Sequence, residues 1–93
     1  MAIYLGDVQS AKATANGSIF GAPARVKSIY YVGASGAGSI TLKNGGASGT
    51  STIVIDTAAS AYGNVIVPGD GVLFTTNVYA NLVNITSLTV FYA

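Results

Sequence analysis

The chain lacks four residue types that carry much of protein chemistry, since it contains no histidine, cysteine, glutamate or tryptophan. Only 8% of its residues are charged. The acids are Asp7, Asp56 and Asp70, and the bases are Lys12, Arg25, Lys27 and Lys43. Proton transfer and covalent catalysis near neutral pH depend on clusters of His, Cys, Glu, Asp and Lys, and the sequence contains no such cluster. We therefore expect a protein that is not an enzyme and that has no cofactor and no metal site.

The low charge also bears on the partners. The formal net charge of +1 gives no field strong enough to attract nucleic acid. Mean hydropathy is +0.56, yet no apolar run approaches the ~20 residues that a membrane-spanning helix needs. We expect neither nucleic acid nor a membrane as a partner. Because so little charge keeps copies of the chain apart, we expect the working form to be surrounded by protein partners.

The missing residue types predict a weak pH dependence. Without histidine and glutamate, no side-chain type present has an ordinary pKa between about 5 and 8. Folding and assembly should therefore change little over that range. Light scattering across the range checks this prediction, and a sharp change in particle size within it would contradict it.

Short runs of alternating character make up most of the sequence. Val, Ile, Thr, Tyr and Phe dominate these runs, and they suit a pleated, half-buried strand. Glycine-rich segments and the turn sequence 68–71 separate the runs. The pattern predicts strands at 2–5, 25–32, 38–43, 51–56, 63–67, 72–76, 78–83 and 87–92, with a less regular pair around an Asn16-Gly17 hairpin turn.

About eight short strands with regular turn signals favour an all-β fold. We expect an antiparallel two-sheet β-sandwich that is jelly-roll-like, formed as a single domain over residues 1–93. Residues 1–20 form either an N-terminal arm or a first hairpin.

Alternation divides the strand residues into an inner and an outer set. The expected core is Val26, Tyr30, Val32, Ile40, Leu42, Ile53, Ile55, Val65, Val67, Val72, Phe74, Leu88 and Val90. Several outer positions, Ile66 among them, are apolar, so either loops or neighbouring subunits must cover them. We favour subunits, because so few charges are left to mark a solvent face. The candidate interface residues are Ile29, Tyr31, Val54, Leu73 and Phe91.

Three features are compatible with ligand binding but favour simpler interpretations. The glycine segments 33–38 and 45–49 lack the spacing of nucleotide-binding loops, and no helix is predicted after them. The aspartates lack the spacing of a calcium loop, and Asp56 and Asp70 suit turns. Tyrosines can stack on sugar rings, but Tyr30 and Tyr92 share the core phase of their strands, which favours packing.

The chain resembles a known group of proteins in its succession of strand, glycine loop and strand. The segments that carry the likeness are Arg25-Val26-Lys27-Ser28-Ile29-Tyr30-Tyr31-Val32-Gly33, Gly38-Ser39-Ile40-Thr41-Leu42-Lys43-Asn44-Gly45-Gly46, Val67-Pro68-Gly69-Asp70-Gly71-Val72-Leu73-Phe74, Val78-Tyr79-Ala80-Asn81-Leu82 and Ser87-Leu88-Thr89-Val90-Phe91-Tyr92. They resemble the small all-β virion structural proteins of tailed bacteriophages, which decorate or cement capsids or belong to tails.

The resemblance implies a non-enzymatic structural role in the virion. The leading expectation is a capsid decoration or cement protein that stabilises the head by oligomeric packing. Its partners would be copies of itself, as a homo-oligomer and by analogy a trimer, and the major capsid protein or another virion protein. The alternatives are a tail or fibre component and, from a different class, a soluble carbohydrate-binding β-sandwich module.

Overall fold

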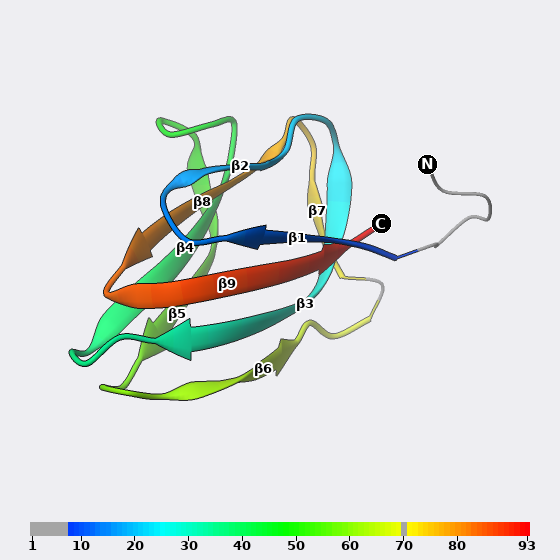
Figure 1. Ribbon diagram of the computed structural model, residues 1–93. Coiled ribbons are helices and arrows are strands. Elements are labelled where there is room, and N and C mark those ends of the chain that lie inside the picture. The colour runs from blue at the N-terminus through cyan, green and yellow to red at the C-terminus, as the bar shows by residue number, and fades with distance from the viewer. Residues whose placement is uncertain (1–7, 70) are drawn as a thin grey trace.

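The computed structural model describes residues 8–69 and 71–93, and within them the chain forms β-strands and no helix (Figure 1). The strands are β1 (Gln9–Ala13), β2 (Gly17–Phe20), β3 (Ala24–Gly33), β4 (Gly38–Asn44), β5 (Thr50–Thr57), β6 (Tyr62–Ile66), β7 (Val72–Phe74), β8 (Val78–Val83) and β9 (Ile85–Tyr92). The strand predicted at 2–5 lies outside the described residues.

Two antiparallel sheets pack face to face. The five-stranded sheet has the order β1-β9-β3-β6, with β7 also paired to β3, and the four-stranded sheet has the order β2-β8-β4-β5. The pairs are nested, because β4 pairs β5, β3 pairs β6, β2 pairs β8 and β1 pairs β9. A long hairpin rolled up on itself produces this nesting, which is the jelly-roll arrangement. The predicted fold class is confirmed.

The amino-terminal strands complete the two sheets instead of forming one hairpin. β1 pairs with β9 in the five-stranded sheet, whereas β2 pairs with β8 in the four-stranded sheet. The Asn16-Gly17 turn therefore carries the chain from one sheet to the other, and the Asn16 side-chain oxygen accepts a hydrogen bond from the Leu82 amide at 2.6 Å. The predicted hairpin around this turn is wrong, and residues 9–20 are packed strands, not an arm.

A β-bulge in β3 reverses the side-chain phase that the sequence predicts. The register of β3 with β9 shifts between Val26 and Ser28, so Lys27 is the additional residue of the bulge. Val26 and Ile29 then both face inward and are fully buried. Tyr30 is 38% exposed.

Four predictions for β3 are therefore wrong. Ile29 and Tyr31 were expected on an outer interface, but Ile29 is fully buried and Tyr31 packs against the core. Tyr30 and Val32 were expected in the core, but both take the outward phase. The cause is the bulge, because an extra residue turns every later side chain to the opposite face.

Elsewhere the expected core is largely confirmed. Six of its members are buried, namely Val26, Ile40, Leu42, Phe74, Leu88 and Val90. Five more are half-buried and pack against them, namely Ile53, Ile55, Val65, Val67 and Val72. Buried residues that the sequence did not indicate are Ala24, Val78, Ala80 and Ile85, whereas the core phase predicted for Tyr92 is confirmed. The ring of Tyr92 packs on Phe20 at a centroid distance of 4.8 Å.

At one end of the sandwich, asparagine side chains link the β4–β5 turn to the β7–β8 loop by hydrogen bonds. The Asn77 oxygen accepts from the amides of Gly45 and Gly46 at 2.9 and 3.0 Å. In return, the Asn44 oxygen accepts from the Thr76 amide at 2.8 Å. Gly45 and Gly46 have φ values of 111° and 86°, which non-glycine residues rarely adopt. The glycines are therefore required by the turn, and no phosphate-binding role is needed to explain them.

A candidate interaction face on the five-stranded sheet

The outer faces of the two sheets differ in chemistry. On the four-stranded sheet, the outward side chains pair as Ser39 with Val83 and Thr41 with Asn81. Lys43 likewise lies opposite Tyr79. Hydroxyl and amide groups on β4 and β8 therefore separate the exposed Val83 on β8 from the exposed Val54 on β5, which lies opposite Thr41.

The outer face of the five-stranded sheet is more aromatic and more aliphatic. Two adjacent rows cross it, one with Phe91, Ser28 and Ile66 and one with Thr89, Tyr30 and Asn64. A third row places Val32 opposite Tyr62. We call the set Tyr30, Val32, Tyr62, Ile66 and Phe91 the aromatic face.

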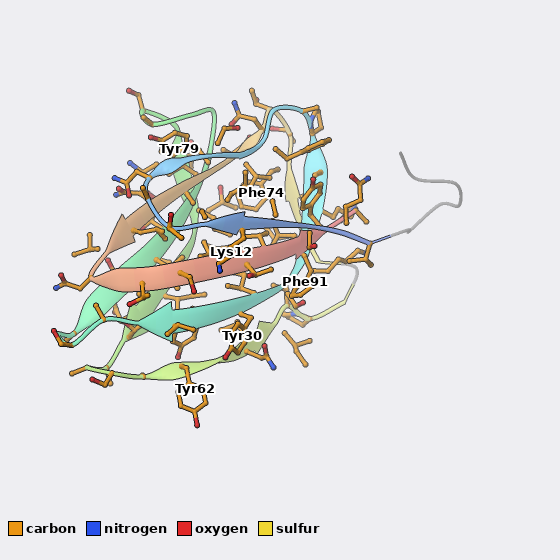
Figure 2. The ribbon with its side chains drawn as sticks, in the orientation of Figure 1. Lys12, Tyr30, Tyr62, Phe74, Tyr79 and Phe91 are labelled. Carbon is orange, nitrogen blue, oxygen red and sulfur yellow. The ribbon has the colours of Figure 1, made fainter. Side chains whose placement is uncertain are left out.

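Three of the five side chains of the aromatic face are exposed to solvent, and the other two, Val32 and Phe91, are half-buried. Ile66 is 80% exposed and Tyr62 is 74% exposed, and both lie on the edge strand β6. Figure 2 shows Phe91, Tyr30 and Tyr62 spread over this sheet, with the Tyr62 ring projecting away from the body of the molecule. Leaving such side chains in water forgoes burial energy of roughly 1.5–3 kcal/mol each. A contiguous group of them is typical of an interaction site.

Strand register sets the spacing of the two most exposed rings. Tyr30 lies directly opposite Asn64, and Tyr62 lies opposite Val32. Tyr30 and Tyr62 are therefore diagonal neighbours on adjacent strands, a relation in which residues lie about 7–8 Å apart. The two phenol rings flank an amide that can donate and accept hydrogen bonds.

Positive charge lies at the margins of the aromatic face. Lys12 on β1 is opposite Thr89, and Arg25 on β3 is opposite Leu73. Both basic side chains belong to exposed residues. Among residues 8–69 and 71–93, the one acid is Asp56 on β5 of the other sheet. A partner of the aromatic face would therefore meet cations at its rim.

The candidate interface residues of the sequence do not form one surface. Val54 is 60% exposed but lies on β5 of the four-stranded sheet. Leu73 is 46% exposed on β7, at the end of the five-stranded sheet, and Phe91 takes the outward phase of β9. Ile29 and Tyr31 are inside, as described above. Tyr62 was missed, although Tyr62, Asn64 and Ile66 share one strand phase, because Gly63 and Asn64 weaken the strand signal there.

The aromatic face is an open surface without a cavity. No pocket is found in the described part of the chain, and no group of His, Cys, Asp or Glu there is suited to a metal ion. No helix in that part is long and apolar enough to cross a membrane.

Comparison with family models, with curated proteins and with solved structures finds no match to this chain. What the arrangement can do is bind a flat partner by contact over several strands.

Proposed function

We propose that the protein is a non-enzymatic structural protein of a tailed-bacteriophage virion, a decoration or cement protein that stabilises the head. It attaches to the major capsid protein or another virion protein through the aromatic face. The observation that carries this proposal is the contrast between the two outer faces. Exposed Tyr30, Tyr62 and Ile66 gather on one sheet, whereas on the other the exposed Val54 and Val83 are set apart by Ser39 and Thr41. A chain whose exposed aromatic side chains gather on one outer face is best accommodated with that face against a partner.

The fold and the sequence resemblance support the proposal independently. Jelly rolls occur in viral capsid domains, and also in lectins and cupins, so the fold is compatible with the role without assigning it. The likeness to small phage virion proteins covers roughly residues 25–92, which include β3 to β9. By the same likeness, the protein acts as a homo-oligomer, with a trimer as the expected state.

Quantitative mass spectrometry of purified virions tests the role. Hundreds of copies per particle would support a decoration or cement protein. A few copies, or some dozens, would instead assign the chain to the tail or a fibre. If purified virions do not contain the chain, the virion role is wrong.

A positive charge introduced on the aromatic face is predicted to weaken attachment. Tyr62→Lys places an ammonium where an exposed ring is proposed to be buried, so binding to capsids stripped of this protein should fall roughly ten-fold or more, given that 1.4 kcal/mol is ten-fold. Tyr79→Lys, on the other sheet, is the matched control and should bind as the wild type does. Co-sedimentation measures both variants. Equal loss in the two variants would contradict an interface on the aromatic face.

A carbohydrate-binding module is the second candidate, and the diagonal placement of Tyr30 and Tyr62, both next to Asn64, favours it. Flat aromatic rings stack on the apolar faces of sugars, and the intervening amide can hydrogen-bond their hydroxyls. Affinity electrophoresis in gels that contain neutral or acidic polysaccharide tests this function. Retardation that Tyr62→Ala abolishes and Tyr79→Ala preserves would support it. No retardation in any gel would remove this candidate.

A further inference from the structure

We infer that the free edge of β5 pairs with β5 of a second copy, antiparallel about a twofold axis at Val54. The two four-stranded sheets would then form one continuous sheet. This inference goes beyond the virion role and does not depend on it, because it uses a different surface from the aromatic face. For the free protein it replaces the trimer expected from the resemblance by a dimer.

The five edge strands of the sandwich are unequally protected, and β7, which pairs with β3 alone, has only three residues. β1 has five residues and carries an exposed lysine, Lys12. β2 has four residues and a register shift between Ser18 and Phe20. β6 has five residues and is followed closely by Pro68. Short length, lysine, irregularity and proline are the devices by which sheet edges avoid unwanted pairing.

β5 is the exception among these edges. It has eight residues, with the sequence Thr-Ser-Thr-Ile-Val-Ile-Asp-Thr, and contains neither proline nor a basic residue. Its partner on one side is β4, and it ends the four-stranded sheet on the other. The one irregularity lies at Thr52, near the start of the strand, and the register from Ile53 to Thr57 is unbroken. A long, regular strand of β-branched residues is a template for another strand.

The side chains of β5 favour one register for self-pairing. A twofold axis at Val54 sets the two Val54 side chains against each other, and Val54 is 60% exposed in the single chain. Ile53 then lies opposite Ile55, and both have part of their surface uncovered. Asp56, the charged residue of the strand, lies opposite Thr52 and so avoids the other Asp56. Apolar residues therefore meet apolar residues on both faces of the new pair.

A cysteine substitution tests the register directly, because the chain contains no cysteine. Directly opposed residues of antiparallel strands have Cα atoms about 4.5–5.5 Å apart, which is within the span of about 4.4–6.8 Å that a disulfide bridges. Val54→Cys should therefore give a covalent dimer under mild oxidation. Thr41→Cys is the control, because Thr41 lies opposite Val54 on β4, with β8 on its other side. Equal cross-linking of both variants, or none for Val54→Cys, would overturn the inference.

A pair of lysine substitutions tests the pairing without cross-linking. Val54→Lys places two ammonium groups together at the axis and should weaken dimerisation about ten-fold or more, with strand content unchanged by circular dichroism. Val83→Lys is the control, because Val83 is 49% exposed on the same outer face but belongs to β8, away from the edge. Sedimentation velocity measures both, and the pairing predicts a dimer for Val83→Lys.

Three outcomes would each refute the pairing. The wild-type chain could stay monomeric at high micromolar concentration, it could form open-ended fibres, or its dimer could persist in Val54→Lys. Tyr62→Lys should still dimerise, so failure of capsid attachment and failure of this pairing are distinguishable.

Discussion

Phe74→Ala is expected to lower the free energy of unfolding by about 3–5 kcal/mol. Phe74 is the largest fully buried side chain, and it lies on β7 against Ala24 of β3. Removing the ring forgoes its burial and leaves a cavity that close-packed neighbours fill only in part. For a domain of this size, each kcal/mol corresponds to about 4–8 °C in Tm, so Tm should fall by about 12 °C or more. Differential scanning calorimetry measures the change.

The adjacent residue provides the control for this prediction. Leu73 is 46% exposed and points to the opposite face of the same short strand. Leu73→Ala should therefore cost about 1 kcal/mol, because only about half of its surface leaves water on folding and no closed cavity is left. If both variants melted at the same temperature, the assignment of Phe74 to the core would be wrong.

Gly38→Ala is expected to destabilise the protein by about 3 kcal/mol or more, because overpacking against backbone cannot relax by a change of side-chain rotamer. A Cβ on Gly38 would overlap the carbonyl oxygen of Val83 and come within 2.8 Å of that of Asn84. Gly38 begins β4, where the chain passes close to the β8–β9 turn. That turn is fixed by hydrogen bonds from the Ala34 amide to the Asn84 oxygen and from the Asn84 amide group to Ala37, both at 3.0 Å. The crowded backbone therefore has little freedom to move away.

Gly17→Ala is the matched control, because Gly17 also begins a strand. No atom lies within 4 Å of a Cβ built on Gly17, and its φ is not in the left-handed region. This substitution should be neutral, or stabilising by about 0.4–1 kcal/mol through the reduced entropy of the unfolded chain. Chemical denaturation compares the two variants. Similar midpoints would contradict the close approach of the β4 and β8–β9 backbones.

The two alanine variants also distinguish a glycine that merely lies beside a turn from a glycine that a tertiary contact requires. The sequence places Gly17 and Gly38 alike, each beside a turn signal. Only the folded backbone distinguishes them, because β8 and β9 approach Gly38 from a separation of more than forty residues along the chain. A glycine imposed by tertiary contact carries no local signature.

By itself, the sequence determined the class of the fold. Alternating β-branched and aromatic residues cannot form an amphipathic helix, and turn residues at short intervals limit strand length. Because each strand carries its apolar side chains on one face, two sheets must pack together to bury these faces. For β4 and β9, the same alternation placed Ile40, Leu42, Leu88 and Val90 correctly in the core.

Tertiary structure decided the face of each side chain in β3, and with it the candidate interaction face. The segment 25–32 contains two competing apolar sets, one with Tyr30 and Val32 and one with Ile29 and Tyr31. An unbroken strand can bury only one set together with Val26. The bulge at Lys27 lets the chain bury Val26 and then Ile29, but a bulge exists only once a partner strand fixes the register, here β9.

Strand order was likewise settled only by the fold. The sequence predicts the strands, but not which of them end a sheet, since that depends on pairings such as β1 with β9 across most of the chain. The rolled hairpin places β5 and β6 at sheet edges, as it does β1, β2 and β7. Val54, Tyr62 and Ile66 are thereby exposed, although the sequence around them does not differ from that of the other strands. Periodicity of two thus fixes which residues can share a face, whereas long-range pairing fixes which face meets solvent or a partner.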